Sequence, residues 1–462
     1  MMKARSGWGG PFFLSSAYEG TMPDDHPTTG SWQAPETLSH EALIAASDDV
    51  LGRPDIAFSE TEHIFRINAL GLDWDMGVMV YEPDDETKIP SGANGRKVGL
   101  FLLHGGAGDY RSMQKLARMI CGKFGYKVTS MTYPGRLYLP DPSRNWPGDT
   151  VNADGTVRTP IWLDGEIISP NEYEIVHDTS LRARYGTRIA ARAKPGSRFY
   201  DRMAAWPAAF EEAMKTICRD HFPDGEYSIY LHGHSTGGPF VHMLCQRIDN
   251  IAGVVGIENS PFGYMYQKMV GYEWPDPFTD VVIRTWRDIA RYKGAEVRSQ
   301  EGDAALMRLP WLMEDVFESW QEGVHLPQFK AEYPLHYANL ATMTEAARAA
   351  AKRLHMNKDE TEALVAQYCG YCHELRGPDA KRVPPILLSI CKHSRDHTDK
   401  AYREVVTPMF AAMDPAPKVS VVRLEIGTHG YEKPEEGLPM GLVPSIARMW
   451  HDAIMGGYYV AN

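Results

Sequence analysis

The sequence has few cysteines, no long apolar run and no excess of basic charge. Six cysteines among 462 residues are too sparse for a disulfide framework. No stretch of about 18 apolar residues occurs, so we expect no membrane-spanning helix. The N-terminal segment also lacks the apolar core of a secretory signal. Together these absences predict a cytoplasmic protein with reduced thiols.

Charge composition narrows the range of partners. The chain carries 60 acidic and 48 basic residues, which gives a net charge of −12. A protein that binds nucleic acid or an anionic membrane concentrates basic residues on one face, and this composition does not favour such a face. Hydrophobic residues make up 43% of the chain, which is enough for a large core. We therefore expect a small-molecule substrate, no nucleic acid and no membrane, and we leave a homo-oligomer open.

Short, continuous apolar runs alternate with helical stretches along much of the chain. Runs of this kind are typical of strands buried on both faces, as in a parallel sheet. A hairpin is predicted between Ile64 and Tyr81. The other predicted strands are 98–103, 127–133, 227–233, 251–258, 385–390 and 419–426. The alternation predicts an α/β fold with a doubly wound, mostly parallel sheet.

The chain divides into four predicted segments. Residues 1–60 lack a clear period and are predicted to form an N-terminal arm. Residues 61–260 form the first part of the α/β core, within which 136–200 is an irregular insertion with room for a small hairpin. Residues 261–380 break the alternation and carry helical patterns, so we expect a helical cap there. Residues 381–462 complete the core.

One pentapeptide carries the chemistry. Residues 233–237 read Gly-His-Ser-Thr-Gly and fit the pattern G-x-S-x-G. An apolar strand precedes them, and a helix whose buried face would include Val241, Leu244 and Ile248 follows, as a nucleophile elbow requires. The glycines let the chain turn sharply, so that the serine hydroxyl projects above the sheet toward a base. Ser235 is therefore the predicted nucleophile.

A second glycine-rich turn supports this prediction. The strand 98–103 runs into His104-Gly105-Gly106-Ala107-Gly108. Such a turn after an early strand can supply one backbone N–H of an oxyanion hole, and the residue after the nucleophile supplies the other. We therefore predict that Gly106 and Thr236 form the oxyanion hole, in which each donor lowers the barrier by about 3–4 kcal/mol.

The motifs HGGAG, TYPGR and GHSTGG occur in this order and together resemble the α/β-hydrolase superfamily. The resemblance covers roughly residues 60–140 and 225–260, and it resumes from about 383 to the end. It implies the α/β-hydrolase fold, a helical cap inserted before the last strands and a serine nucleophile. The motifs are specific for the fold and for serine chemistry, but they do not specify a substrate.

The catalytic base is expected in the loop after the last strand. The strand 419–426 leads into Gly427-Thr428-His429-Gly430, so His429 is the predicted base. His393 and His397 are alternatives, but they follow the preceding strand and suit the chain order less well.

Two positions remain open for the acid that orients His429. Asp396, with Asp399 as a weaker choice, follows the penultimate strand, which is the commonest position in this fold. Glu258 ends a buried strand, and its surroundings resemble a subgroup of serine esterases whose catalytic Glu follows the sixth strand in an "IEP…PF" sequence. This chain departs from that subgroup because Asn259 replaces the proline. A carboxylate at a buried strand end needs a partner, so we prefer Glu258 and keep Asp396 as the alternative.

We predict no metal and no cofactor. Cys369 and Cys372 lie in CGYCH, which matches a haem-attachment pattern. Haem attachment by this pattern normally requires export, and the motif falls in the predicted cap. A zinc site would need further ligands, which Cys391 and His393 could supply only through the fold.

These features predict a carboxylic-ester hydrolase that acts through an acyl-enzyme. The aromatic and methionine residues of the predicted cap favour a medium-sized, partly aromatic or apolar small molecule as its substrate. The same residues would suit a lactonase, thioesterase, amidase or C–C bond hydrolase, because the fold does not fix the reaction. A non-enzymatic receptor that binds a small ligand in the same pocket is the alternative of a different class.

Overall fold

The computed structural model describes the segments that form the sheet and most of the helices around it. The described residues are 32–69, 72–105, 109–134, 173–178, 188–193, 198–235, 237–245, 247–259, 340–353, 383–394, 402–411 and 415–460, together with isolated residues near 170, between 355 and 365, and at 397 and 399. None of the helices in these segments is long and apolar enough to cross a membrane.

One large sheet organises the described part of the chain. Its strands are β1 (Thr37–Leu38), β2 (Phe58–Ala69), β3 (Leu72–Pro83), β4 (Lys97–Leu103), β5 (Lys127–Met131), β8 (Tyr227–Gly233), β9 (Ile251–Ile257), β10 (Ile386–Cys391) and β11 (Val419–Leu424). They lie in the order β1-β11-β10-β9-β8-β4-β5-β3-β2. All neighbours are parallel except β2 with β3 and β3 with β5. The predicted hairpin and the doubly wound, mostly parallel sheet are confirmed.

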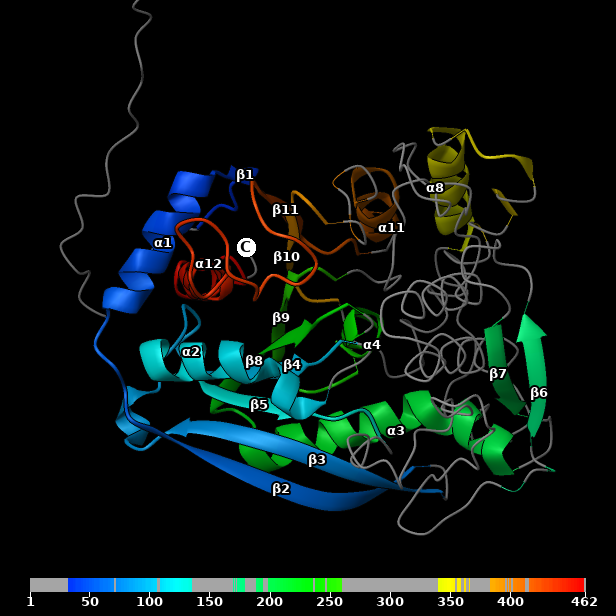
Figure 1. Ribbon diagram of the computed structural model, residues 1–462, viewed down its shortest axis with the longest axis horizontal. Coiled ribbons are helices and arrows are strands. Elements are labelled where there is room, and N and C mark those ends of the chain that lie inside the picture. Colours follow the sequence, from blue (N-terminus) through cyan, green and yellow to red (C-terminus); the bar gives the residue numbers. More distant parts are fainter. Residues whose placement is uncertain are drawn as a thin grey trace, which may run out of the picture.

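Helices cover both faces of this sheet. They are α1 (His40–Gly52), α2 (Gln114–Phe124), α3 (Arg198–His221), α4 (Gly237–Leu244), α8 (Leu340–Arg353), α11 (Thr407–Ala411) and α12 (Val443–Met455), with short helical turns η1 (Glu86–Lys88), η2 (Tyr110–Met113) and η6 (Tyr402–Val406). Figure 1 shows α1, α2 and α12 together on one side, with α3 and α4 on the other. Strand β4 is buried on both faces. On one face, Val98 and Leu100 join the core under α2 and α12. On the other face, Gly99 contacts Phe222 at the end of α3.

The predicted N-terminal arm contains a helix that its composition did not indicate. Helix α1 begins after Ser39, whose hydroxyl accepts the N–H of Ala42 at 3.2 Å as an N-cap. Its buried side chains are Leu43, Ser47 and Val50, and α1 packs against α12. The buried face includes a serine, which weakens the apolar period from which a helix is predicted.

The predicted insertion and cap are described only in part. Strands β6 (Tyr173–Asp178) and β7 (Arg188–Ala193) form an antiparallel hairpin within the insertion. Helix α8 lies within the predicted cap segment and packs against α11 and η6 (Figure 1). Residues 261–339, which make up most of that segment, lie outside the described residues. The division of the chain into domains therefore stays a prediction.

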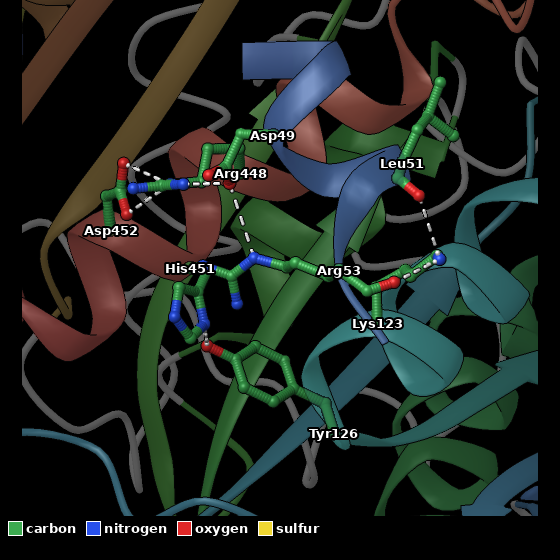
Figure 2. A network of polar contacts seen from close by, with 8 residues as sticks. All are labelled: Asp49, Leu51, Arg53, Lys123, Tyr126, Arg448, His451 and Asp452. Carbon is green, nitrogen blue, oxygen red and sulfur yellow. Dashed lines mark hydrogen bonds and ion pairs between the residues drawn. The ribbon is translucent and has the colours of Figure 1, made fainter. Parts of the chain in front are cut away.

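A network of charged side chains joins α1, α2 and α12 (Figure 2). The Arg448 guanidinium on α12 donates to Asp452 at 2.8 Å and forms an ion pair with Asp49 on α1. Asp49 also pairs with Arg53, at 3.4 Å. The Lys123 ammonium on α2 donates to the backbone oxygen of Arg53 at 2.8 Å, at the carboxyl end of α1. A cation at this position is favourable because the last carbonyl groups of a helix carry partial negative charge.

A partly buried histidine completes the network. The Tyr126 hydroxyl and the His451 Nδ1 share a hydrogen bond of 2.8 Å (Figure 2), and the His451 ring stacks on Phe124. Burial, aided by the guanidinium groups of Arg53 and Arg448, lowers the pKa of His451 to about 3. This ring is therefore neutral at physiological pH.

Arg448→Met should lower the free energy of unfolding by about 2–3 kcal/mol. The Arg448 side chain is 14% exposed, and its loss removes the cation that binds Asp452 and one of the two that bind Asp49. Both carboxylates reach solvent, so the cost falls below that of a fully buried pair. Arg348→Met is the matched control, because Arg348 and its partner Glu362 are both more than half exposed; it should cost less than about 1 kcal/mol. Equal losses in denaturant titrations would contradict the structural role of Arg448.

Candidate active site

Ser235 lies on a sharp turn between β8 and α4. Its backbone is left-handed, with φ of 51°, a conformation that costs a non-glycine residue roughly 1–2 kcal/mol. The turn depends on close backbone approach. A Cβ atom on Gly233 would lie 2.3 Å from the Gly237 oxygen, and one on Gly237 would lie 2.6 Å from the His104 oxygen. Val241 and Leu244 on α4 are buried as predicted, whereas Ile248 is buried but lies beyond the end of the helix. A strand, a sharp turn and a helix in this order are typical of a nucleophile elbow.

Glu258 follows β9, next to the elbow. Its backbone is also left-handed, with φ of 56°, and its carbonyl oxygen accepts the Ser235 N–H at 3.0 Å. The side chain is fully buried. One carboxylate oxygen accepts the backbone N–H of Cys391 at 2.7 Å, and the other accepts the Ser394 hydroxyl at 2.5 Å. The second oxygen also lies 3.0 Å from His429 Nδ1.

His429 stands in the loop after β11, and its side chain is 23% exposed. With Nδ1 engaged by Glu258, the other ring nitrogen, Nε2, is the one that could exchange a proton with a serine hydroxyl. The structure thus places the preferred acid beside the predicted base. The alternative acid, Asp396, lies outside the described residues. Asp399 binds Arg403 at 2.8 Å and Arg423 at 3.3 Å.

Chain topology explains why these groups meet. The elbow follows β8, Glu258 follows β9, Ser394 follows β10 and His429 follows β11. These strands are parallel neighbours, so their carboxyl ends lie at one edge of the sheet, where ligands bind in doubly wound proteins. Two features decide the fold: a nucleophile elbow follows a central parallel strand, and a loop that carries a histidine follows the last large strand. This chain has the α/β-hydrolase fold.

No protein-family model and no curated protein matches the sequence. Solved structures match along most of the chain at low identity. An esterase from Pseudomonas putida ECU1011 is 12% identical with a TM-score of 0.36, over 91% of this chain and 89% of that chain. The Francisella virulence factor BioJ is 13% identical with a TM-score of 0.36, over 90% and 89%, and vibralactone cyclase is 12% identical with a TM-score of 0.34, over 91% and 88%. These TM-scores are too low to carry an argument, so the α/β-hydrolase assignment rests on the strand order and the elbow.

His234, the residue before Ser235, joins three parts of this candidate site. Its ring stacks on His429 with centroids 4.7 Å apart and planes at 24°, and its Nε2 lies 3.2 Å from the His429 carbonyl oxygen. A carbonyl can only accept, so Nε2 carries the ring proton and donates it. Burial, followed by the neighbouring His429 and His232 rings, holds the pKa of His234 well below its usual value. A Cβ atom on Gly105 would meet His234 Nδ1 at 2.9 Å, so the HGGAG turn also contacts this ring.

The first part of the HGGAG turn is fixed to the end of β5 by His104 and Tyr133. The Tyr133 hydroxyl donates to the His104 oxygen at 2.8 Å, and the Tyr133 N–H donates to His104 Nε2 at 3.3 Å. The two rings are stacked with centroids 4.1 Å apart. Because Nε2 accepts, the neutral ring carries its proton on Nδ1, which donates to the Gly105 oxygen at 2.6 Å. Gly106 and Thr236, the predicted oxyanion donors, lie outside the described residues.

Asn259 braces the elbow, in the position where the resembling esterases carry proline. Its amide nitrogen donates to the Gly233 oxygen at 2.6 Å, and its amide oxygen lies 3.3 Å from Nε2 of His242 on α4. All of these groups are buried, so each hydrogen bond offsets a desolvation cost. A proline at this position could make neither contact.

Three residues near the pair were not assigned a role from the sequence. Ser394 donates to Glu258, Asn259 braces the elbow, and His397 stacks on His429 with centroids 5.5 Å apart. Only Asn259 carried a signal, because it breaks the "IEP" pattern. The sequence suggests His397 only as an alternative base and gives no sign of its contact with His429. The candidate thiols Cys369 and Cys372 lie outside the described residues, whereas Cys391 is buried and free.

Two buried histidines flank the elbow and are neutral. His232 on β8 shares a hydrogen bond of 3.2 Å with the Val255 oxygen, and burial lowers its pKa to about 3. His242 on α4 is bound to Asn259, and burial lowers its pKa to about 4. The unfolded chain takes up protons at both positions below about pH 6.5, whereas the folded protein does not until the pH nears 3–4. The stability that these two neutral histidines contribute is therefore fully present above about pH 6.5 and is lost as the pH falls toward 4.

In His232→Met the free energy of unfolding should fall less steeply as the pH decreases. Removing one neutral buried histidine should reduce the slope of unfolding free energy against pH by about 1.4 kcal/mol per pH unit between pH 6 and 4. Ile229→Met, in the same buried strand, is the control, because it perturbs packing without removing a titrating group. Denaturant titrations at pH 4, 5 and 6 give the slopes. A wild-type slope in His232→Met would contradict the assignment of a buried neutral ring.

Proposed function

We propose that this protein is a serine hydrolase that cleaves carboxylic esters through an acyl-enzyme. One observation carries the proposal: a buried carboxylate, Glu258, engages Nδ1 of His429 directly beside a left-handed nucleophile elbow at Ser235. Strained backbone conformations persist where the surrounding structure enforces them and are concentrated at functional sites. The hydrogen bond between Ser235 N–H and the Glu258 oxygen links the two strained residues.

The proposed mechanism is acyl transfer to water. His429 Nε2 removes the proton from Ser235 Oγ, which attacks the ester carbonyl carbon. The backbone N–H groups of Thr236 and Gly106 hold the developing oxyanion. Glu258 stabilises the charged His429 ring, which then protonates the leaving alkoxide. Water hydrolyses the acyl-enzyme by the same steps in reverse.

Glu258 serves as the acid of this triad. Four features support its role: complete burial, a hydrogen bond from a backbone N–H, a second from a hydroxyl, and contact with His429 Nδ1. A buried carboxylate is costly without such partners. Three donors fix its orientation, as an acid that holds a histidine in one tautomer requires.

The substrate is proposed to be a medium-sized, partly aromatic or apolar ester. This part of the proposal rests on the aromatic and methionine residues of segment 261–380, most of which lies outside the described residues. Lactones, thioesters, amides and substrates with an activated C–C bond belong in the same substrate screen, because one triad can serve all of them.

Substitutions at three positions should separate the triad from its alternative. On a p-nitrophenyl ester, Ser235→Ala should lower kcat by at least about 10³-fold, and Glu258→Gln by about 10²–10⁴-fold, because the glutamine would select the wrong histidine tautomer. Asp396→Asn is the matched control for the acid and should stay near the wild-type rate. Thermal unfolding of each variant checks that the fold survives.

Two outcomes would contradict this proposal. Turnover retained by folded Ser235→Ala would show that Ser235 is not the nucleophile. A larger loss in Asp396→Asn than in Glu258→Gln would transfer the acid role to Asp396.

A further inference from the structure

A third metal-binding side chain lies beside the Glu258–His429 pair. His397 is fully buried, and its ring stacks on His429 with planes at 28°. One potential ligand atom from each of these three residues lies within 4.8 Å of the other two. The residues come from the segments that follow β9, β10 and β11, so the packing of the sheet brings them together.

Two imidazole nitrogens and one carboxylate oxygen form a known donor set for zinc. Catalytic zinc sites use two histidines and a glutamate, with water as the fourth ligand. Zinc bonds of about 2.0–2.1 Å place neighbouring tetrahedral ligands about 3.3–3.5 Å apart. The His429 Nδ1 and Glu258 Oε2 atoms are 3.0 Å apart, so they would separate by about 0.3–0.5 Å to reach this spacing. The ligand atom of His397 has to move roughly 1–1.5 Å closer to the other two ligand atoms, and rotation of the His397 or His429 ring can supply this movement.

We propose that Glu258, His397 and His429 form an inhibitory site for Zn²⁺. The inhibitory consequence rests on the proposed function, whereas the binding does not. His429 is the partly exposed member of the three, so its side of the cluster gives a hydrated ion its access. Zinc has to replace hydrogen bonds that Glu258 already accepts from His429 and Ser394, so we expect an affinity in the micromolar range.

The site inhibits by changing the tautomer of His429. In the resting protein Nδ1 carries the proton and donates it to the Glu258 carboxylate, which leaves Nε2 able to accept a proton from Ser235. Zinc binds the lone pair of Nδ1, so the neutral ring must carry its proton on Nε2. The ring proton moves from Nδ1 to Nε2, the hydrogen bond between Nδ1 and Glu258 is replaced by bonds to zinc, and no net proton is released. His429 then has no lone pair facing the nucleophile and cannot act as a base.

Zinc titration of the EDTA-treated protein tests the proposal with two readouts. Calorimetry with ZnCl₂ at pH 7.5 should give one micromolar site, and ester hydrolysis should be inhibited with the same midpoint and recover after EDTA. Mg²⁺ should do neither, because it prefers an all-oxygen octahedral site. His397→Gln should weaken binding and inhibition at least tenfold, each measured against that variant's own uninhibited rate. His393→Gln, on the exposed turn four residues earlier, should leave both at wild-type values.

The two readouts distinguish the failure of this proposal from the failure of the proposed function. If the protein hydrolyses no ester, calorimetry on wild type and His397→Gln still decides the site. Absence of zinc binding, or equal binding in His397→Gln, would overturn it. So would zinc binding that is lost in the double variant Cys369→Ser, Cys372→Ser and kept in His397→Gln. Zinc bound through His397 without inhibition would overturn the inhibitory role.

Discussion

The fully buried carboxylate of Glu258 is the constraint on which the site depends. An ionised group removed from water must recover several kcal/mol through its partners. Here those partners are the Cys391 N–H, the Ser394 hydroxyl and the His429 ring. Cys391 ends β10 and Ser394 follows it, His429 follows β11, and Glu258 follows β9. One side chain therefore fixes the carboxyl ends of three neighbouring strands relative to one another, and with them the loop that presents the candidate base.

Ser235, the proposed nucleophile, is positioned by a related constraint. Ser235 and Glu258 both adopt left-handed backbone conformations and are joined by a backbone hydrogen bond of 3.0 Å. Such conformations cost roughly 1–3 kcal/mol each, and the packing around them offsets that cost. Gly237 allows the elbow to approach the HGGAG turn, and Asn259 ties the end of β8 to α4. Among the described non-glycine residues, Asn250 and His355 also have a left-handed backbone, but only Ser235 and Glu258 lie at the candidate site.

Much of this arrangement could be predicted from the sequence, because its signals are local. Buried parallel strands are continuous apolar runs, so β8 and β9 were placed within one residue of their observed ends. The elbow at Ser235 and the loop of His429 follow from chain order once those strands are known. The coarse fold therefore needed no tertiary information.

The remaining features depend on contacts between distant segments. Glu258 and Asp396 are both carboxylates after parallel strands, and only the contact with His429, 171 residues away from Glu258, favours one of them. His397 gave no sign in the sequence that its ring would stack on His429. Helix α1 escaped prediction because its buried face is partly polar and its stability comes from packing on α12.

The central claim is that Ser235 is an activated nucleophile served by His429 and Glu258. The reaction of the native protein with a fluorophosphonate, followed by peptide mass spectrometry and a crystal structure of the adduct, tests it most directly. We expect one phosphonyl group on Ser235 Oγ, with the phosphoryl oxygen facing the N–H groups of Gly106 and Thr236 and with His429 Nε2 beside the ester oxygen. An unlabelled protein, or an adduct on any other residue, would contradict it and would favour a binding protein that uses the fold without its chemistry.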